Sequence, residues 1–94
     1  MGKWGRFRTV RLEKEAEDFI DQTRKKDDQF DDYWRGVEWR LARAPEGGAP
    51  MQSSDSGEYW VIRIPRNEIA KTRTLWIFYS FTQNMVLIYR VRFE

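Results

Sequence analysis

The stretch from residue 74 to residue 81 constrains the fold most strongly, because it is apolar on both faces of a β-strand. Its apolar side chains alternate between one face, with Leu75, Ile77, Tyr79 and Phe81, and the other face, with Trp76 and Phe78. A strand that is apolar on both sides is typical of the middle of a sheet. The sequence therefore predicts a sheet built around these residues.

Two further strands are predicted beside it. Tyr59–Ile64 alternates, with Trp60, Ile62 and Ile64 on one face, and Pro65 ends it. Gln83 and Asn84 predict a tight hairpin turn into a last strand, Met85–Phe93. In that strand the alternation places Leu87, Tyr89, Val91 and Phe93 on one face and Val86, Ile88, Arg90 and Arg92 on the other.

The first half of the chain predicts a short strand at residues 7–12 and then two helices. Acidic residues from Glu13 onward and the basic end Arg24-Lys25-Lys26 match the two poles of a helix over residues 13–26. Asp27 or Asp28 can cap the second helix. Its apolar stripe consists of Phe30, Trp34, Val37, Leu41 and Ala44, with Tyr33 beside it. The helix should stop near Ala44, before Pro45.

Residues 45–58 are rich in Gly, Pro and Ser and are predicted to form a loop. The whole pattern indicates one α+β domain over residues 1–94: an N-terminal strand, a two-helix hairpin and a three-stranded antiparallel sheet. Five Trp, six Phe and four Tyr supply enough apolar area for a core in so short a chain.

Several classes of chemistry are excluded by composition. The chain has no His and no Cys, so histidine bases, Ser-His-Asp triads, thiol catalysis and disulfides are ruled out. No phosphate-loop glycine motif is present. The acid pairs near the helix starts are explained by capping, so no metal or other cofactor is expected. Short apolar runs and the lack of a secretion signal indicate a cytoplasmic protein with no membrane role.

Charge is distributed unevenly along the chain. Residues 1–12 carry +4, residues 13–58 carry −6 and residues 59–94 carry +4. If the ends form one sheet, basic side chains gather on it, which suits a polyanion such as RNA. Arginines also accompany aromatic residues, which can stack on bases. An ordinary solvent-exposed face of an antiparallel sheet would carry outward arginines as well, so this pattern alone does not define a site.

The order of elements resembles the RelE/ParE superfamily of bacterial toxins, with the HigB-like branch nearest. Tyr59-Trp60-Val61-Ile62-Arg63-Ile64-Pro65 is similar to a "W-E-L-R-I-P"-like strand of that family. The segments 75–81 and 86–93 resemble its "R-I-F-Y-x-F" strand and its closing strand. Val61 stands where HigB-like sequences often have Glu, and no middle-strand arginine is present at Leu75 or Trp76.

This resemblance implies a type II toxin that cleaves mRNA on the ribosome, by attack of the 2′-hydroxyl on the adjacent phosphate. That reaction requires a base, a cation and an acid. The residues implied for catalysis are Glu58, Arg73, Tyr79 and Arg90. Those implied for RNA binding are Arg63, Arg66, Lys71, Arg92 and Phe93.

The expected protein partner is a cognate antitoxin, and Trp39, on the far side of its helix stripe, is a candidate contact. Two alternatives remain open. A ParE-like toxin of the same fold would inhibit DNA gyrase without catalysis, and a non-toxic module would keep only the fold.

Overall fold

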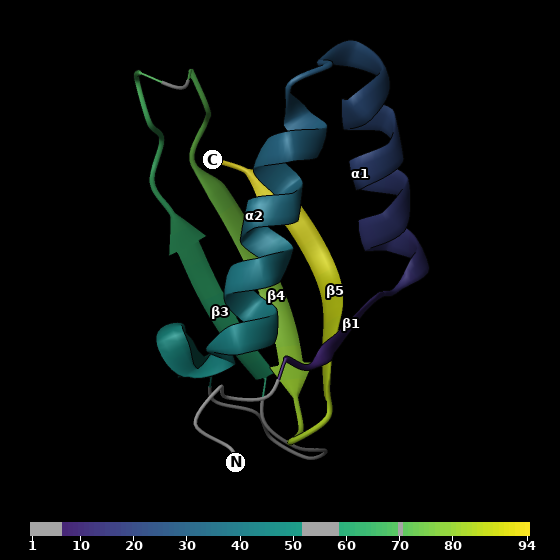
Figure 1. The fold of residues 1–94 in the computed structure, drawn as a ribbon, viewed down its shortest axis with the longest axis vertical. Coiled ribbons are helices and arrows are strands. Elements are labelled where there is room, and N and C mark those ends of the chain that lie inside the picture. The colour runs from purple at the N-terminus through teal and green to yellow at the C-terminus, as the bar shows by residue number, and fades with distance from the viewer. Residues whose placement is uncertain (1–6, 52–58, 70) are drawn as a thin grey trace.

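The computed structural model describes residues 7–51, 59–69 and 71–94, and these ranges form an α+β domain in which two helices pack on a mixed sheet (Figure 1). The elements are, in chain order, β1 (Thr9–Leu12), α1 (Lys14–Lys26), α2 (Phe30–Arg43), a 3-10 turn (Pro45–Gly47), β2 (Ala49–Met51), β3 (Tyr59–Ile64), β4 (Leu75–Phe81) and β5 (Met85–Phe93). The α+β class and both helices are as predicted.

The predicted three-stranded antiparallel sheet is only part of the sheet that the described residues form. This sheet has five strands in the order β1-β5-β4-β3-β2, with β1 parallel to β5 and the other pairs antiparallel. β4 therefore lies at the centre, as its two apolar faces predicted. The described residues contain a strand that was not predicted, because Ala49–Met51 lies in the segment assigned to a loop. This strand is short and exposed, and it contains Pro50, which is tolerated here because β2 is an edge strand.

The predicted faces of β5 are wrong in its first half, because the strand contains a bulge. Phe78 pairs with Arg90 but the next residue, Tyr79, pairs with Ile88, so Tyr89 has no partner on β4. The extra residue shifts the alternation by one position. The side chains that face the helices are consequently Val86, Ile88 and Val91, all buried, while Leu87 and Tyr89 face the other side.

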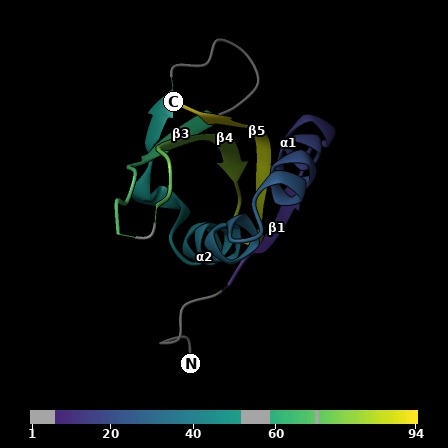
Figure 2. The same cartoon turned by 90° about the horizontal axis from the view of Figure 1, so that it is seen from above.

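The two helices bury a continuous stripe against one face of the sheet. α2 lies across the concave face of β3, β4 and β5, and α1 lies beside β5 (Figure 2). Phe30, Trp34, Val37 and Leu41 are buried as predicted, but Ala42 is buried in place of Ala44. Gln29, rather than Asp27 or Asp28, precedes the helix. Its backbone N–H donates to Asp27 Oδ1 at 2.9 Å.

α1 continues along the edge of β5 that β1 leaves free. β1 pairs only with residues 85–88, and the Glu13 N–H donates to the carbonyl of Ile88 at 2.8 Å. The helix that follows therefore starts beside the second half of β5, where the rings of Phe19 and Phe93 are 5.3 Å apart. This geometry places the first turn of α1 next to Arg90.

Tyr79 belongs to the core and does not reach the surface. Its side chain is fully buried, and its hydroxyl donates to the carbonyl of Pro45. Burial raises the pKa of this hydroxyl. Gly48 packs against the same hydroxyl, and a Cβ at this position would collide with Tyr79 Oη and with the backbone carbonyl of Val61.

We expect Gly48→Ala to destabilise the fold, because the backbone of β3 cannot move away as a flexible side chain could. The free energy of unfolding should fall by about 1–3 kcal/mol, the usual range for overpacking. Gly47→Ala is the matched control, since no atom lies within 4 Å of a Cβ there. Urea unfolding of both variants tests this, and equal stability of the two would contradict the packing described for Tyr79.

Candidate nucleic-acid interface

The face of the sheet opposite α2 carries arginine and aromatic side chains in rows that run across the strands. We call it the helix-free face, and it consists of Tyr59, Val61, Arg63, Trp76, Phe78, Ser80, Leu87, Tyr89, Arg90 and Arg92. One row joins Arg63, Trp76 and Arg92, which are opposite one another in the register. The next row joins Val61, Phe78 and Arg90. The three arginines are exposed and the aromatic rings are half-buried.

Glu94 holds the first row together. Its carboxylate accepts hydrogen bonds from Arg63 Nε at 2.9 Å and from Trp76 Nε1 at 3.0 Å. The hydrogen bond from Arg63, supported by that from Trp76, lowers the pKa of Glu94. The guanidinium of Arg63 is thus oriented by a carboxylate, and a guanidinium binds carboxylate and phosphate through the same fork of N–H groups.

Glu15 plays the corresponding part in the second row. Arg90 Nε donates to Glu15 Oε2 at 2.7 Å, and Arg90 Nη2 lies 3.5 Å from Oε1. Glu15 comes from the first turn of α1, which the free edge of β5 brings to this place. Arg92 differs from its two neighbours, because among the described residues it has no carboxylate partner. Arg92 could therefore bind an anion without first losing an ion pair, whereas Arg63 and Arg90 would have to give up theirs.

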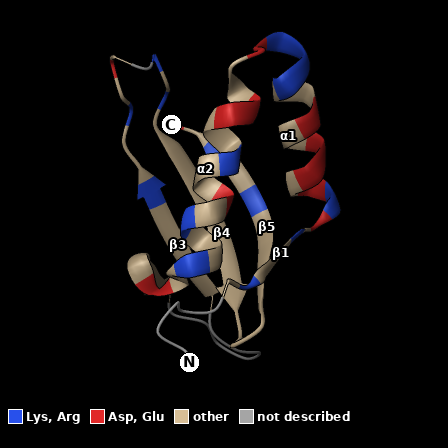
Figure 3. Cartoon of the chain, in the orientation of Figure 1, with Lys and Arg blue, Asp and Glu red and all other residues tan. Residues whose placement is uncertain are grey.

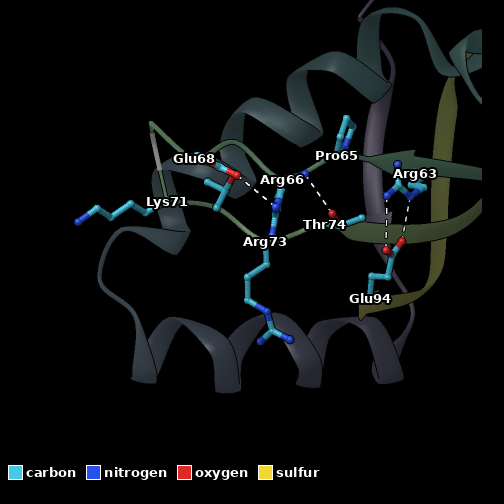
Figure 4. Close-up of a pocket in the computed structure, with 9 residues that line it drawn as sticks. Arg63, Pro65, Arg66, Glu68, Lys71, Arg73, Thr74 and Glu94 are labelled. Atoms are coloured by element: carbon cyan, nitrogen blue, oxygen red, sulfur yellow. Dashed lines mark hydrogen bonds and ion pairs between the residues drawn. The ribbon is translucent and has the colours of Figure 1, made fainter.

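A second basic cluster lies at the β3–β4 connection, where Arg66, Lys71 and Arg73 line a hollow of about 730 Å³ with Arg63 and Glu94 (Figure 4). Arg66 pairs with Glu68 at 3.1 Å. Lys71 has a φ of 59°, an uncommon value for a residue with a side chain, which belongs to the turn. In Figure 4, Arg73 points away from Arg63 and Glu94. Its guanidinium lies 4.1 Å from the centre of the Phe93 ring.

The charge distribution matches the expectation from the sequence only in part. Basic side chains mark β3, β5 and the β3–β4 connection, but α1 and α2 both carry basic as well as acidic side chains (Figure 3). Net charge is only +2, so the surface is basic locally and not as a whole. Such a local patch attracts a phosphate backbone over roughly one Debye length, about 8–10 Å.

The residues predicted for catalysis do not form one group. Arg90 lies on the helix-free face, Arg73 lies at the β3–β4 connection, and Tyr79 is enclosed in the core, where it cannot reach a substrate. Glu58 lies outside the described residues. We therefore assign Tyr79 a structural role.

Three predicted RNA-binding residues, Arg63, Arg66 and Lys71, share the hollow of Figure 4, and Arg92 lies on the helix-free face. Phe93 is different, because it packs against Phe19 and Phe30 at ring distances of 5.3 and 6.1 Å. Its ring is part of the packing between sheet and helices and is not a free stacking platform.

Sequence reasoning missed Glu15 and Glu94 as members of this surface and treated Trp76 and Phe78 only as strand-forming residues. The two-sided apolar pattern of β4 did contain the signal for the rings. Only one face of the sheet is covered by α2, so Trp76 and Phe78 remain half-buried on the other. Nothing in the local sequence around Glu15 indicates its distance to Arg90.

Trp39 lies on the outer surface of α2 and is 54% exposed. The ring of Phe7, 55% exposed, is 5.8 Å from it, and the guanidinium of Arg43 lies 4.8 Å from its centre. Because α2 covers the opposite side of the sheet, this patch is separate from the helix-free face.

Neither helix is long and apolar enough to cross a membrane, and the described residues contain no cluster of three or more acidic side chains that could hold a metal ion.

Replacing Arg63 by Gln should raise the pKa of Glu94 toward its ordinary value, because the main cause that lowers it is removed. Because the pKa of Glu94 is lower in the folded state than in the unfolded state, the Arg63–Glu94 pair stabilises the fold at pH values above the unfolded-state pKa. That contribution is lost as the pH falls through the folded-state pKa. An NMR titration of the Glu94 carboxyl carbon measures the shift, with Arg35→Gln on the outer surface of α2 as control. An unchanged pKa in the Arg63 variant would contradict the pairing.

No family model matches this chain, and no curated protein or solved structure matches it significantly.

Proposed function

We propose that this chain is a toxin of a type II toxin–antitoxin pair and that its helix-free face binds and cleaves mRNA. The observation that carries the proposal is the pair of cross-strand rows, in which Arg63, Arg90 and Arg92 alternate with half-exposed aromatic rings. Arginine binds phosphate through a fork of N–H groups, and aromatic faces stack on unpaired bases. The resemblance to RelE/ParE sequences, given by residues 59–65, 75–81 and 86–93, supports the same function.

A phosphate of the RNA would bind Arg92 directly and would displace the Glu94 carboxylate from Arg63. Arg92 offers an unpaired guanidinium among the described residues, and Arg63 and Arg90 are already oriented by Glu94 and Glu15. In the cleavage step, one of these arginines would stabilise the charge that develops on the phosphate when the 2′-hydroxyl attacks. Glu58 remains the proposed base.

A binding inhibitor without catalysis is the second candidate, in the manner of ParE-like gyrase inhibitors or of a non-toxic module. It is favoured by the ion pairs of Arg63 and Arg90 and by the burial of Tyr79. These ion pairs leave the described helix-free face with binding groups but without an unpaired carboxylate that could act as a base.

Inducible expression in a bacterial host, with growth followed and RNA 5′ ends mapped, distinguishes the candidates. The proposed function predicts growth arrest with new 5′-hydroxyl ends in coding regions. Arg92→Ala should weaken RNA binding about tenfold, as expected when a charged contact worth roughly 1.4 kcal/mol is lost. Arg35 is an exposed arginine on α2, and Arg35→Ala should leave RNA binding unchanged.

Growth arrest without RNA cuts would instead support gyrase inhibition. No arrest in several hosts would support the non-toxic module. Cleavage that survives substitution of Arg63, Arg73, Arg90 and Arg92 together would contradict the proposed site.

The exposed rings of Phe7 and Trp39 are our proposed contact for the antitoxin. Arg35 and Arg43 are exposed and lie one helical turn before and after Trp39 on α2, so an acidic segment with an apolar side chain would complement this surface. Trp39→Ala should abolish co-purification with a small protein encoded by the neighbouring gene while leaving RNA binding intact. Retained co-purification would exclude Trp39 as a main contact.

A further inference from the structure

A hollow of about 410 Å³ opens on the helix-free face and is separate from the basic cluster of Figure 4. Three aromatic rings and one ion pair line it, together with Met51 of β2; the lining residues are Glu15, Met51, Tyr59, Phe78, Tyr89 and Arg90. They come from five different elements, α1, β2, β3, β4 and β5. Apolar walls with a few polar groups on one side are typical of a site for a flat, partly polar ligand.

The aromatic part of the hollow is held in place by its own contacts. The rings of Tyr59 and Tyr89 meet edge to face, with centroids 5.2 Å apart and planes inclined at 70°. The hydroxyl of Tyr89 lies 2.9 Å from Ser80 Oγ, which restrains the ring further. Phe78 belongs to the central strand between them. Restrained, half-exposed rings of this kind lose little entropy when a base stacks on them, and such stacking contributes about 1–3 kcal/mol per base.

The polar side of the hollow presents acceptors and donors next to each other. Arg90 holds the Glu15 carboxylate through Nε at 2.7 Å, whereas its second contact, from Nη2 to Oε1, is long at 3.5 Å. A ligand with two adjacent donors can displace this second contact and bind both carboxylate oxygens while the Nε contact stays. The guanidinium of Arg90 has five N–H groups, of which this pair uses two, so it keeps donors for another acceptor. A ligand that fits both groups must offer two adjacent donors and, beside them, one acceptor.

We propose that this hollow binds a guanine base of single-stranded RNA. The inference rests on the proposed RNA-binding function and assigns it a base preference. Guanine offers the required edge: its N1–H and its 2-amino group donate to the two oxygens of Glu15, and its O6 accepts from Arg90. Adenine and cytosine each place one amino donor beside a ring acceptor, and uracil has one ring N–H, so each leaves part of the Glu15 carboxylate unpaired.

Fluorescence anisotropy with short labelled uridine RNAs tests the proposal on the intact chain. The RNAs carry a central guanosine, adenosine, cytidine, uridine or inosine. The guanosine RNA should bind about tenfold more tightly than the adenosine, cytidine and uridine RNAs, the ratio that corresponds to roughly 1.4 kcal/mol. Inosine lacks the 2-amino group and should fall between guanosine and the others.

Two variants with the same change of charge complete the test. Glu15→Gln should remove the preference for guanosine, because a neutral amide cannot accept both donors. Glu17→Gln, an exposed glutamate on the same helix, should keep the preference. Circular dichroism shows whether both variants fold.

Each other outcome identifies which inference fails. Equal binding of all five RNAs would overturn the guanine site and leave RNA binding in place. A preference that persists in Glu15→Gln, or that disappears equally in Glu17→Gln, would overturn the role of Glu15. If none of the RNAs binds, the guanine site and the proposed function both fail.

Discussion

The unpaired residue in β5 is the constraint on which the rest of the structure depends. Without the extra residue at Tyr89, the alternation that buries Val86 and Ile88 would turn Val91 away from the helices. A one-residue shift reverses every side chain beyond it. The bulge lets both halves of β5 contribute to one core, and it also places Tyr89 and Arg90, neighbours in sequence, together on the helix-free face. Stability and the proposed site thus rely on the same local irregularity.

The arginines of this face are balanced by carboxylates from neighbouring elements. Glu94 follows β5, and Glu15 reaches across from α1, so the ion pairs connect the face to the rest of the fold. All four side chains are substantially exposed, and ion pairs of this kind contribute little to stability because water and salt screen them. Their main effect is orientation. An arginine already held in a fork geometry loses less freedom when a phosphate or a base replaces or joins its partner.

Much of the fold could be predicted from the sequence because it depends on short-range periodicity. The stripe of α2 and the two-sided pattern of β4 each identified an element and its position. The features that escaped prediction depend on pairing between distant segments. β2 forms only because Ala49–Met51 finds the edge of β3, and the bulge is defined only by the register with β4. Neither β2 nor the bulge can be recognised from the local alternation of apolar and polar residues.

The candidate site shows the same division. Arg63, Arg90 and Arg92 were found because charge and alternation place arginines outward on a sheet. Tyr79 was predicted to join these arginines in the site, but it belongs to the core. Gly48 leaves space for its hydroxyl beneath the 3-10 turn. Glu15 was not found, because 75 positions separate it from Arg90. The acceptor Glu15 lies at the start of a helix and the donor Arg90 lies in a bulged strand. Only the path of α1 along the free edge of β5 brings them together, so this pair can be seen only in the three-dimensional structure.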